Sequence, residues 1–558
     1  MSKPEIHYEV LGGNGNSWTI VDIAHDEKSA REEATRVFAT GKFPAVKVLK
    51  EKYDPKHNTY TTIEIFFQGR KVKKSKFEST SNFPCWKPAD LYSYEGRRTI
   101  GLSFKSVLES WQISPTELIH HAEYYYKLDN TGTMVQSAVQ RAAVSQVSGT
   151  DTSVQERMKQ IYSVIDQAVE RLKKVEPLAP KFKGDISEVL AQLEGKTGGE
   201  FLLICTITQH FKSLDTIRQK LAAILEMVYN EQNEMLLKIS DNMVSEYLGH
   251  ASTLMELLGK KQGLGEALLT VAYLIRGELR DKFAKAGEPI DRELEIIDSF
   301  FASGLFPNTR AMLISRITKE LEGGSKLADG YLIHEMKLLS DLIGLLRREG
   351  SEDANEAGLV ETAKVRVNRY LNNEFMAEFL SKAANPIEEI LRLMSLEKYV
   401  MGENNKRKVG SYLVPVVLAT DNEVYFSGVD GKYLERMQEL NKAQRAVIKS
   451  NIPDSHKENV VPKLDEYCFG IMNKAKIIKR IDANAKSGTD AGQKLLEMLS
   501  KGYFTEGNSA KIARKITRKY MKEPGFLEDC IDAPTEQERV RKLLGFRDLL
   551  FKAGMADV

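Results

Sequence analysis

Two side chains that could bind a metal, Glu117 and His120, stand three residues apart in a stretch with helical character. In helical bundles this spacing places a carboxylate and an imidazole on one helix face, where they can hold iron or manganese. Such a centre needs a second Glu-x-x-His pair and two further glutamates, and the sequence contains no second pair. His120 and His121 also precede three tyrosines, which suit a packed helix face. We therefore interpret the pair as part of a structural helix and predict neither a metal nor a cofactor.

Two glycine-rich stretches resemble phosphate-binding loops. GGNGNS (12–17) lies between two apolar, alternating runs, whereas a phosphate loop needs its glycines between a strand and a helix. EGKTGGE (194–200) contains Gly-Lys-Thr, but Leu190 occupies the position of the first glycine that this motif requires. The sequence therefore predicts no nucleotide site, and it predicts that Gly12, Gly13 and Gly15 form a solvent-exposed hairpin turn without a ligand.

Signatures of nucleophilic or zinc-dependent catalysis are also absent from the sequence. It contains neither Gly-x-Ser-x-Gly nor His-Glu-x-x-His, and most of its remaining histidines are scattered singly. We therefore predict no catalytic residue, although an enzyme with its site assembled from distant residues stays open as an alternative, because such sites leave no local pattern.

The most polarised segment is SAKIARKITRKYMK (509–522). As a helix it places Ile512, Ile516 and Tyr520 in one line, which predicts burial of these three against their own module. The rest of its surface carries six cations, Lys511, Arg514, Lys515, Arg518, Lys519 and Lys522. Such a helix suits phosphates, an anionic membrane surface or an acidic protein. The simpler alternative is a solvated face, balanced by nearby acids such as Glu523, Glu528 and Asp529.

Composition gives no global preference for an anionic partner. The 558 residues include 80 Lys plus Arg and 78 Asp plus Glu, a net charge of +2. The four cysteines show no metal-binding or disulfide spacing, which favours a reducing compartment. The first ten residues lack an apolar signal-peptide core, and no apolar run is long enough to span a bilayer. These features predict a cytoplasmic protein without a transmembrane segment.

The elements that position these residues divide into two classes. The first seventy residues show the order ββαββ, with strands at 5–11, 18–23, 45–53 and 60–67 and a helix that begins after Asp26. Beyond them the pattern is almost entirely helical, including a capping box at Ser114 and Glu117 and an amphipathic stretch at 154–175. The predicted fold is thus an α+β N-terminal domain (ββαββ) followed by a predominantly all-α multi-helix region. Its predicted parts are 1–69, a linker at 70–98, and helical modules at 99–285, 286–410 and 411–558.

Three helical segments resemble one another weakly and suggest repeated modules. Residues 300–321 align with 498–520 if one residue is inserted, and both have a glycine, then an aromatic residue two positions on, then an Ile-Thr-basic triplet. The stretch 392–413 is a third candidate. We predict the same helix–loop–helix shape for the first two segments, with Phe306 and Phe504 buried equivalently.

These observations favour a non-enzymatic interaction or regulatory protein whose helical modules form partner-binding surfaces. The expected partner is another protein, with an acidic surface as one option. A nucleic-acid-binding protein that uses 509–522 is the first alternative, and an enzyme with a dispersed site is the second.

Overall fold

A computed structural model describes residues 6–14, 17–24, 26–40, 43, 45–54, 59–69, 83–147, 152–231, 233–259, 261, 263–328, 332–347 and 354–555. Contacts divide the chain into two compact units, which comprise 1–105 with 122–173, and 106–121 with 174–558. No helix within these ranges combines the length and the apolar character that crossing a membrane requires.

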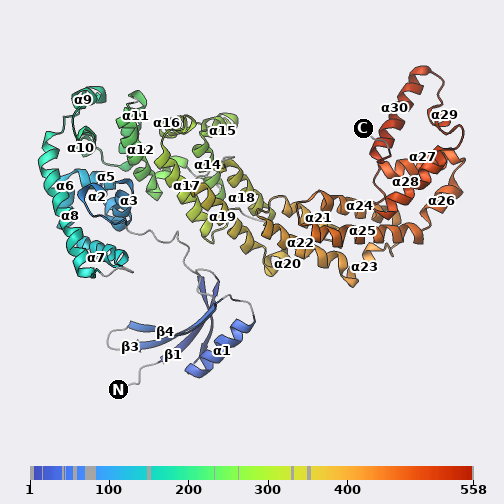
Figure 1. The fold of residues 1–558 in the computed structure, drawn as a ribbon, viewed down its shortest axis with the longest axis horizontal. Helices are drawn as coiled ribbons and strands as arrows, with labels where there is room; N and C mark the ends of the chain where they lie inside the picture. Colours follow the sequence, from blue (N-terminus) through green and yellow to red (C-terminus); the bar gives the residue numbers. More distant parts are fainter. Residues whose placement is uncertain are drawn as a thin grey trace. The chain divides into compact units, whose positions relative to one another are not determined.

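The N-terminal sheet confirms the predicted order ββαββ (Figure 1). Strands β1 (Ile6–Asn14), β2 (Ser17–Ala24), β3 (Ala45–Asp54) and β4 (Thr59–Gly69) form one antiparallel sheet in the order β2-β1-β3-β4. Helix α1 (Glu27–Ala39) begins at Asp26, whose carboxylate accepts the amide of Ser29. Alternate residues of the strands and small residues of α1 form the core: Val10, Val46, Val48, Ala30 and Ala34.

The glycine-rich hairpin is tighter than the sequence predicted. Gly12 and Gly13 lie within β1 and pair with β2, and Asn14 pairs with Ser17, so the connection is only two residues long. Gly12 is buried, and a Cβ atom there would lie 2.5 Å from the ring of Phe43. The prediction of an exposed turn was therefore wrong for Gly12, because the pleat continues through it. Gly15 lies outside the described residues.

Beyond α1, the described part of the first unit contains five helices. Two of them, α2 (Pro88–Leu91) and α3 (Tyr94–Ser103), begin inside the stretch predicted as a linker. The others are α6 (Ala122–Asp129), α7 (Met134–Gln146) and α8 (Val154–Val175), the last matching the amphipathic stretch 154–175. Arg157 of α8 is buried and donates to the backbone oxygen of Cys85 at 3.0 Å, which ties this helix to the segment before α2.

The stretch that opens with the predicted capping box, 114–128, forms two helices. The capping box is present, because Ser114 accepts the amide of Glu117 while the Glu117 carboxylate accepts the amide of Ser114. The helix that it opens, α5 (Pro115–His120), nevertheless ends at an extended residue, His121. The boundary between the two units follows directly after His121. The periodicity of the sequence continues through the break, so it gave no sign of it.

The second unit is entirely helical in its described part. In chain order its elements are α4 (Lys105–Trp111), α5, η1 (Glu176–Leu178), α9 (Ile186–Leu193), α10 (Gly199–Phe211), α11 (Ile217–Asn230), α12 (Glu234–Gly249), α13 (Ala251–Leu258), α14 (Leu264–Arg276), α15 (Leu279–Ala286), α16 (Arg292–Ala302), α17 (Pro307–Glu322), α18 (Leu332–Leu346), α19 (Ala354–Tyr370), α20 (Asn373–Ser381), α21 (Pro386–Glu397), α22 (Glu403–Leu418), α23 (Thr420–Phe426), α24 (Tyr433–Lys449), α25 (Asp454–Lys474), α26 (Ile477–Asn484), α27 (Gly488–Ser500), α28 (Asn508–Met521), α29 (Phe526–Ile531) and α30 (Glu536–Lys552).

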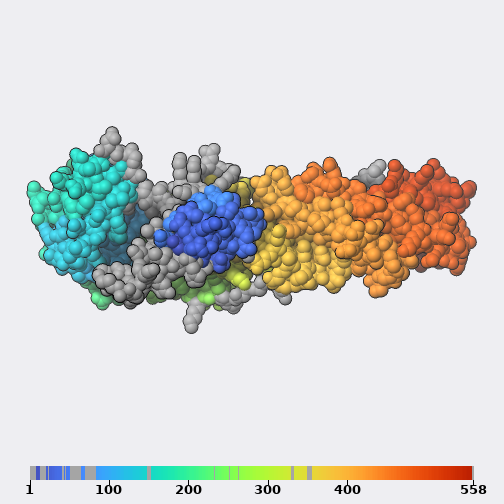
Figure 2. Space-filling model, turned by 90° about the horizontal axis from the view of Figure 1, so that it is seen from below, coloured from blue at the N-terminus to red at the C-terminus, as the bar shows by residue number. Residues whose placement is uncertain are grey.

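Many of these helices stack in two rows (Figure 1). In one row each helix contacts the next in the order α12, α17, α19, α22, α25 and α28. A second row, α11, α16, α14, α18, α21 and α24, packs against the first. Along the C-terminal half the surface colour passes from yellow through orange to red (Figure 2). Segments that are neighbours in sequence are thus also neighbours in space, as in solenoid proteins.

The predicted likeness between 300–321 and 498–520 is confirmed for the turn that ends the first helix of each segment. The same shape does not continue through the loop, because Phe306 is left-handed (φ 60°) and Phe504 is not. In both segments a helix ends at a glycine in the left-handed region, Gly304 (φ 75°) and Gly502 (φ 71°). The amide of the residue after each glycine donates to a carbonyl five residues earlier, which is the Schellman pattern of helix termination. Phe306 and Phe504 follow and are both buried. The shared glycine therefore marks the same helix termination in both segments, and a buried aromatic residue follows it in each.

A carboxylate from an earlier helix closes the first of these turns. Asp241 of α12 is buried and accepts the amides of Asn308 (2.9 Å) and Thr309 (2.8 Å) at the start of α17. The Thr309 hydroxyl donates to the same carboxylate at 2.8 Å. The first amides of a helix have no partner within the helix, so this carboxylate satisfies them and complements the helix dipole.

The second turn has the same closure. Asp465 of α25 accepts the amides of Asn508 (2.6 Å) and Ser509 (3.2 Å) and the hydroxyl of Thr505 (2.7 Å). The residue that caps the start of α28 is Gly507. A Cβ atom on Gly507 would lie 2.3 Å from the Asp465 carboxylate, so only glycine allows this close approach.

The aligned register of the two segments requires correction. Since Asn308 and Thr309 correspond to Asn508 and Ser509, two residues are inserted after the turn rather than one. The buried positions of the two helices then coincide: Thr309, Leu313 and Ile317 in α17, and Ser509, Ala513 and Thr517 in α28. The Ile-Thr-basic triplets consequently lie one residue out of register, and their likeness does not reflect equivalent positions.

The third segment, 392–413, shares only part of this arrangement. Val400 is buried in the turn after α21, and Gly402 caps α22 with φ 87°. The side chain of Asn405 donates to the backbone oxygen of Lys364 in α19 at 2.9 Å. Lys364 stands beside the start of α22, but its carbonyl accepts a side-chain amide, whereas Asp241 and Asp465 accept the first backbone amides of α17 and α28. Whether the three segments are copies of one module stays a prediction.

Candidate functional site

The helix proposed as a binding surface, α28, packs through its small residues. Ser509, Ala510, Ala513 and Thr517 are buried, and α28 contacts both α25 and α27. Ile512, Ile516 and Tyr520 pack against their own module as predicted, but they are only half-buried and do not form the buried face. They lie on one flank, where they pack against the edge of the core and the Tyr520 hydroxyl donates to Asp482 at 2.6 Å. Small side chains let the neighbouring helices approach closely, and this decides which face is buried.

The opposite face of α28 carries five exposed cations, which we call the cationic row: Lys511, Lys515, Arg518, Lys519 and Lys522. They recur at three- and four-residue intervals, so they share one side of the helix. Within the described part of the chain none of their side chains makes an ion pair or a hydrogen bond. The acids Glu523, Glu528 and Asp529, which the sequence offered as balancing charges, do not pair with them. The cationic row is therefore available to a partner.

Arg514 differs from these five residues. Its guanidinium is half-buried and donates to both carboxylate oxygens of Glu506, at 3.0 and 2.7 Å. It also donates to the backbone oxygen of Ala553 at 3.0 Å, just after α30. Arg514 thus joins the turn before α28 to the end of α30, and its charge has an internal partner. Although the sequence grouped it with the other cations, it has a structural role here.

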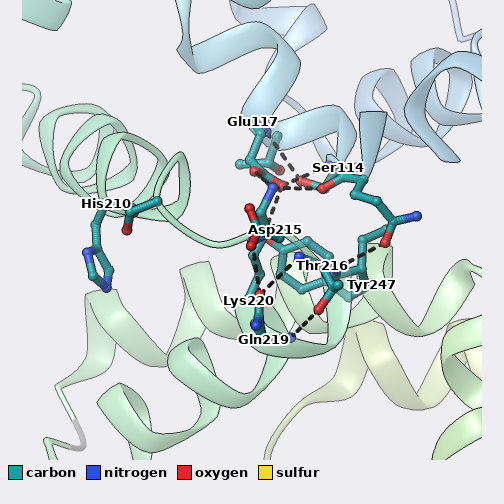
Figure 3. A network of polar contacts seen from close by, with 12 residues as sticks. Ser114, Glu117, His210, Asp215, Thr216, Gln219, Lys220 and Tyr247 are labelled. Carbon is teal, nitrogen blue, oxygen red and sulfur yellow. Dashed lines mark hydrogen bonds and ion pairs between the residues drawn. The ribbon is translucent and has the colours of Figure 1, made fainter. Parts of the chain in front are cut away.

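Glu117 and His120, the metal-like pair, have other partners. Glu117 is 0% exposed and lies 2.7 Å from the ammonium of Lys220, which is 2% exposed (Figure 3). Its carboxylate also accepts the amide of Ser114 at 2.8 Å and the hydroxyl of Tyr247 at 3.1 Å. His120 bonds through Nδ1 to the backbone oxygen of Thr116 and packs on Phe201. The two side chains therefore do not converge on one position.

The elements around Glu117 bring this network together from three parts of the chain. Glu117 lies on α5, Lys220 on α11 and Tyr247 on α12. The Lys220 ammonium donates also to the backbone oxygen of Gln112 at 2.7 Å, and the Gln112 side chain accepts the amide of Ile217 at 3.2 Å. Gln112 adopts a left-handed conformation, with φ 54°, to make both contacts. The network fixes the start of α11 against α5.

The electrostatics of this network indicate a structural role. Burial raises the pKa of Glu117, and the charge of Lys220 opposes that rise. Burial also raises the pKa of Tyr247 far above 10. Perturbed pKa values are common in active sites, but a substrate must reach the groups concerned. Glu117, Lys220 and Tyr247 are buried, and the partners described above satisfy the Glu117 carboxylate.

The other histidines near this region do not complete a site. His121 lies 3.2 Å from Glu176, and His210 lies apart from the network in Figure 3. Burial lowers the pKa of His210, whose ring packs on Phe182. Throughout the described ranges no group of three or more His, Cys, Asp or Glu side chains is arranged to hold a metal ion.

Comparison of the chain with known protein families, with curated proteins and with solved structures finds no match. The geometry of the molecule is therefore what supports a proposal of function.

Sequence reasoning did not find the residues that organise these sites. Lys220 lies 103 positions from Glu117, and Asp465 lies 43 positions before Asn508. One local signal was present for Asp465, because Gly507 directly precedes Asn508 and a glycine at a helix start permits close approach of another group. No comparable signal marked Lys220.

Proposed function

We propose that the chain is a non-enzymatic binding protein that holds an acidic protein partner on the cationic row of α28. The observation that carries this proposal is that five exposed, neighbouring cations lack a partner among the described residues, whereas Arg514 on the same helix has one. The stacked helices keep α28 in place through its opposite face, so the row is presented on a rigid element. Rigid presentation reduces the entropy lost on binding.

An acidic protein fits this surface better than a nucleic acid. Proteins that hold single strands combine cations with aromatic side chains on which bases stack. The aromatic residue of α28, Tyr520, lies on the half-buried flank and is bonded to Asp482. A short row of cations on one helix suits a carboxylate-bearing segment of similar length.

Removing charge from the cationic row should weaken binding without changing the fold. The variant Lys511→Gln/Lys515→Gln/Arg518→Gln/Lys519→Gln should keep the thermal stability of the parent, because exposed, unpaired charges contribute little to folding. Its affinity for a fluorescent poly-glutamate peptide should fall at least about tenfold at low salt. Fluorescence anisotropy measures the affinity and calorimetry the stability.

A matched control removes four other exposed cations of the same region. Lys442→Gln/Arg445→Gln/Lys449→Gln/Lys474→Gln changes the net charge equally but leaves α28 intact. Equal loss of affinity in both variants would show that overall charge, and not the cationic row, attracts the peptide. Tighter binding of duplex or single-stranded DNA than of poly-glutamate, lost with the α28 variant, would instead favour the nucleic-acid alternative.

A further inference from the structure

Helix α30 has a second apolar face that nothing in the described chain covers. Its inner face packs through Phe546, Leu549 and Leu550, and the helix contacts α27 and α29. On the outer face Val540, Leu543, Leu544 and Phe551 are 49%, 44%, 61% and 54% exposed. Their spacing of three, one and seven residues places them in a single stripe along the helix. Four large apolar side chains in one exposed stripe indicate an interaction surface.

Two charged residues lie in the same stripe, one toward each end. Glu536 stands four residues before Val540, and Arg547 stands four residues before Phe551. Within the part of the chain that the structure describes, neither side chain has an ion-pair or hydrogen-bond partner. They cannot pair with each other in one copy, because eleven residues of helix separate them by about 16 Å.

We propose that a second copy of this chain covers the stripe, with the two α30 helices antiparallel about a twofold axis between Leu543 and Leu544. A twofold interface brings the same surface of both subunits together, so the surface must be self-complementary. In this register Leu543 lies opposite Leu544 of the second copy, and Val540 lies opposite its Arg547. The arginine stem covers Val540 while its guanidinium extends one turn further to Glu536.

The charge order of the stripe supports this occupant. Antiparallel pairing places the acidic start of each stripe beside the basic end of the other, and it also opposes the two helix dipoles. A parallel pair would instead place Glu536 beside Glu536 and Arg547 beside Arg547. The stripe is about 25 Å long, since α30 has 17 residues. An interface of this size is typical of weak association, so the dimer should dissociate in the micromolar range.

The proposal is tested on the full chain by sedimentation velocity over a concentration series. We expect a monomer–dimer equilibrium with a dissociation constant below about 0.1 mM, which is the range of weak interfaces. Leu544→Asp should abolish the dimer. The matched control, Val424→Asp, changes another exposed apolar residue, on α23, and should leave the dimer intact. A chain that stays monomeric throughout, or a dimer that Leu544→Asp leaves unchanged, would overturn the proposal.

Charge exchange tests the antiparallel register. Glu536→Lys and Arg547→Glu should each raise the dissociation constant at least about tenfold, because both contacts of the dimer become repulsive. The double variant should restore it to within a few-fold of the parent. An equal mixture of the two single variants should also form a dimer, since a mixed pair has two attractive contacts. If neither the double variant nor the mixture forms a dimer with nearly the affinity of the parent, this arrangement is excluded. Circular dichroism checks that each variant remains folded.

Discussion

Lys220→Met should cost the second unit about 3–5 kcal/mol of unfolding free energy, because it leaves the buried carboxylate of Glu117 without its counter-charge. The Lys220 ammonium lies 2.7 Å from that carboxylate, and both side chains are buried. The methionine roughly preserves the apolar volume of the lysine stem. The loss is therefore electrostatic, and it should appear as an earlier transition in urea denaturation.

Two companion variants identify the cause of this loss. Glu117→Gln/Lys220→Met removes both charges and should regain at least half of the lost stability, because no uncompensated charge remains buried. Lys238→Met breaks an exposed ion pair with Glu200 and should cost less than about 1 kcal/mol. If Lys220→Met costs no more than Lys238→Met, the buried pair does not hold α5 to α11.

The loss of unfolding free energy caused by Lys220→Met should depend on pH, and the pKa of Glu117 fixes the direction. Burial already raises the pKa of Glu117 from 4.5, and without Lys220 it should rise further. A carboxyl whose pKa is higher in the folded than in the unfolded chain contributes most stability below its unfolded pKa and loses it as the pH rises through its folded pKa. The penalty of Lys220→Met should thus be smaller at pH 5 than at pH 7. Glu117→Gln/Lys220→Met should lack this difference.

The fold class was predictable because its elements have local signals. The strands of the N-terminal sheet alternate apolar and polar residues, and Asp26 marks the start of α1. The amphipathic pattern at 154–175 likewise gave the bounds of α8. The break at His121 had no such signal, because the pattern on both sides is helical and the tertiary structure decides where the chain turns.

The sites were less predictable, because their partners are distant in sequence. The sequence identified α28 as a basic amphipathic helix, but it assigned burial to Ile512 and Ile516 when the small residues Ala513 and Thr517 are inside. Hydrophobicity alone ranks isoleucine above alanine, whereas close packing between helices favours small side chains. The structural role of Arg514 was also hidden from the sequence. Besides Glu506, its partner is the backbone oxygen of Ala553, which lies 39 residues away in the chain.

Asp465→Ala should cost about 2–4 kcal/mol, because it removes three hydrogen bonds and leaves the buried amide of Ser509 and hydroxyl of Thr505 unpaired. The first turn of α28 should then open more often. Hydrogen exchange of the amides of 508–513 measures this locally, which is preferable in a chain with two units that need not unfold together.

The equivalent variant, Asp241→Ala, should have a similar effect on α17. Asp241 makes the same kind of contacts to Asn308 and Thr309, so faster exchange should be confined to the start of that helix. Asp454→Ala serves as the control: its carboxylate is 89% exposed, and its loss should change the unfolding free energy by less than about 0.5 kcal/mol. Unchanged exchange at the start of α28 in Asp465→Ala would mean that the carboxylate does not hold the turn.

A conservative change separates charge from hydrogen bonding in this cap. Asp465→Asn keeps one side-chain oxygen that can accept an amide, but it loses the negative charge at the positive end of the α28 dipole. Asp465→Asn should therefore lower the unfolding free energy by about half as much as Asp465→Ala does. If both variants lose the same amount, the charge dominates. In that case exchange at the first amides of α22 should be faster than at those of α17 and α28 in the parent protein, because the neighbouring group from α19 is the Lys364 carbonyl, which accepts the Asn405 side chain and carries no negative charge.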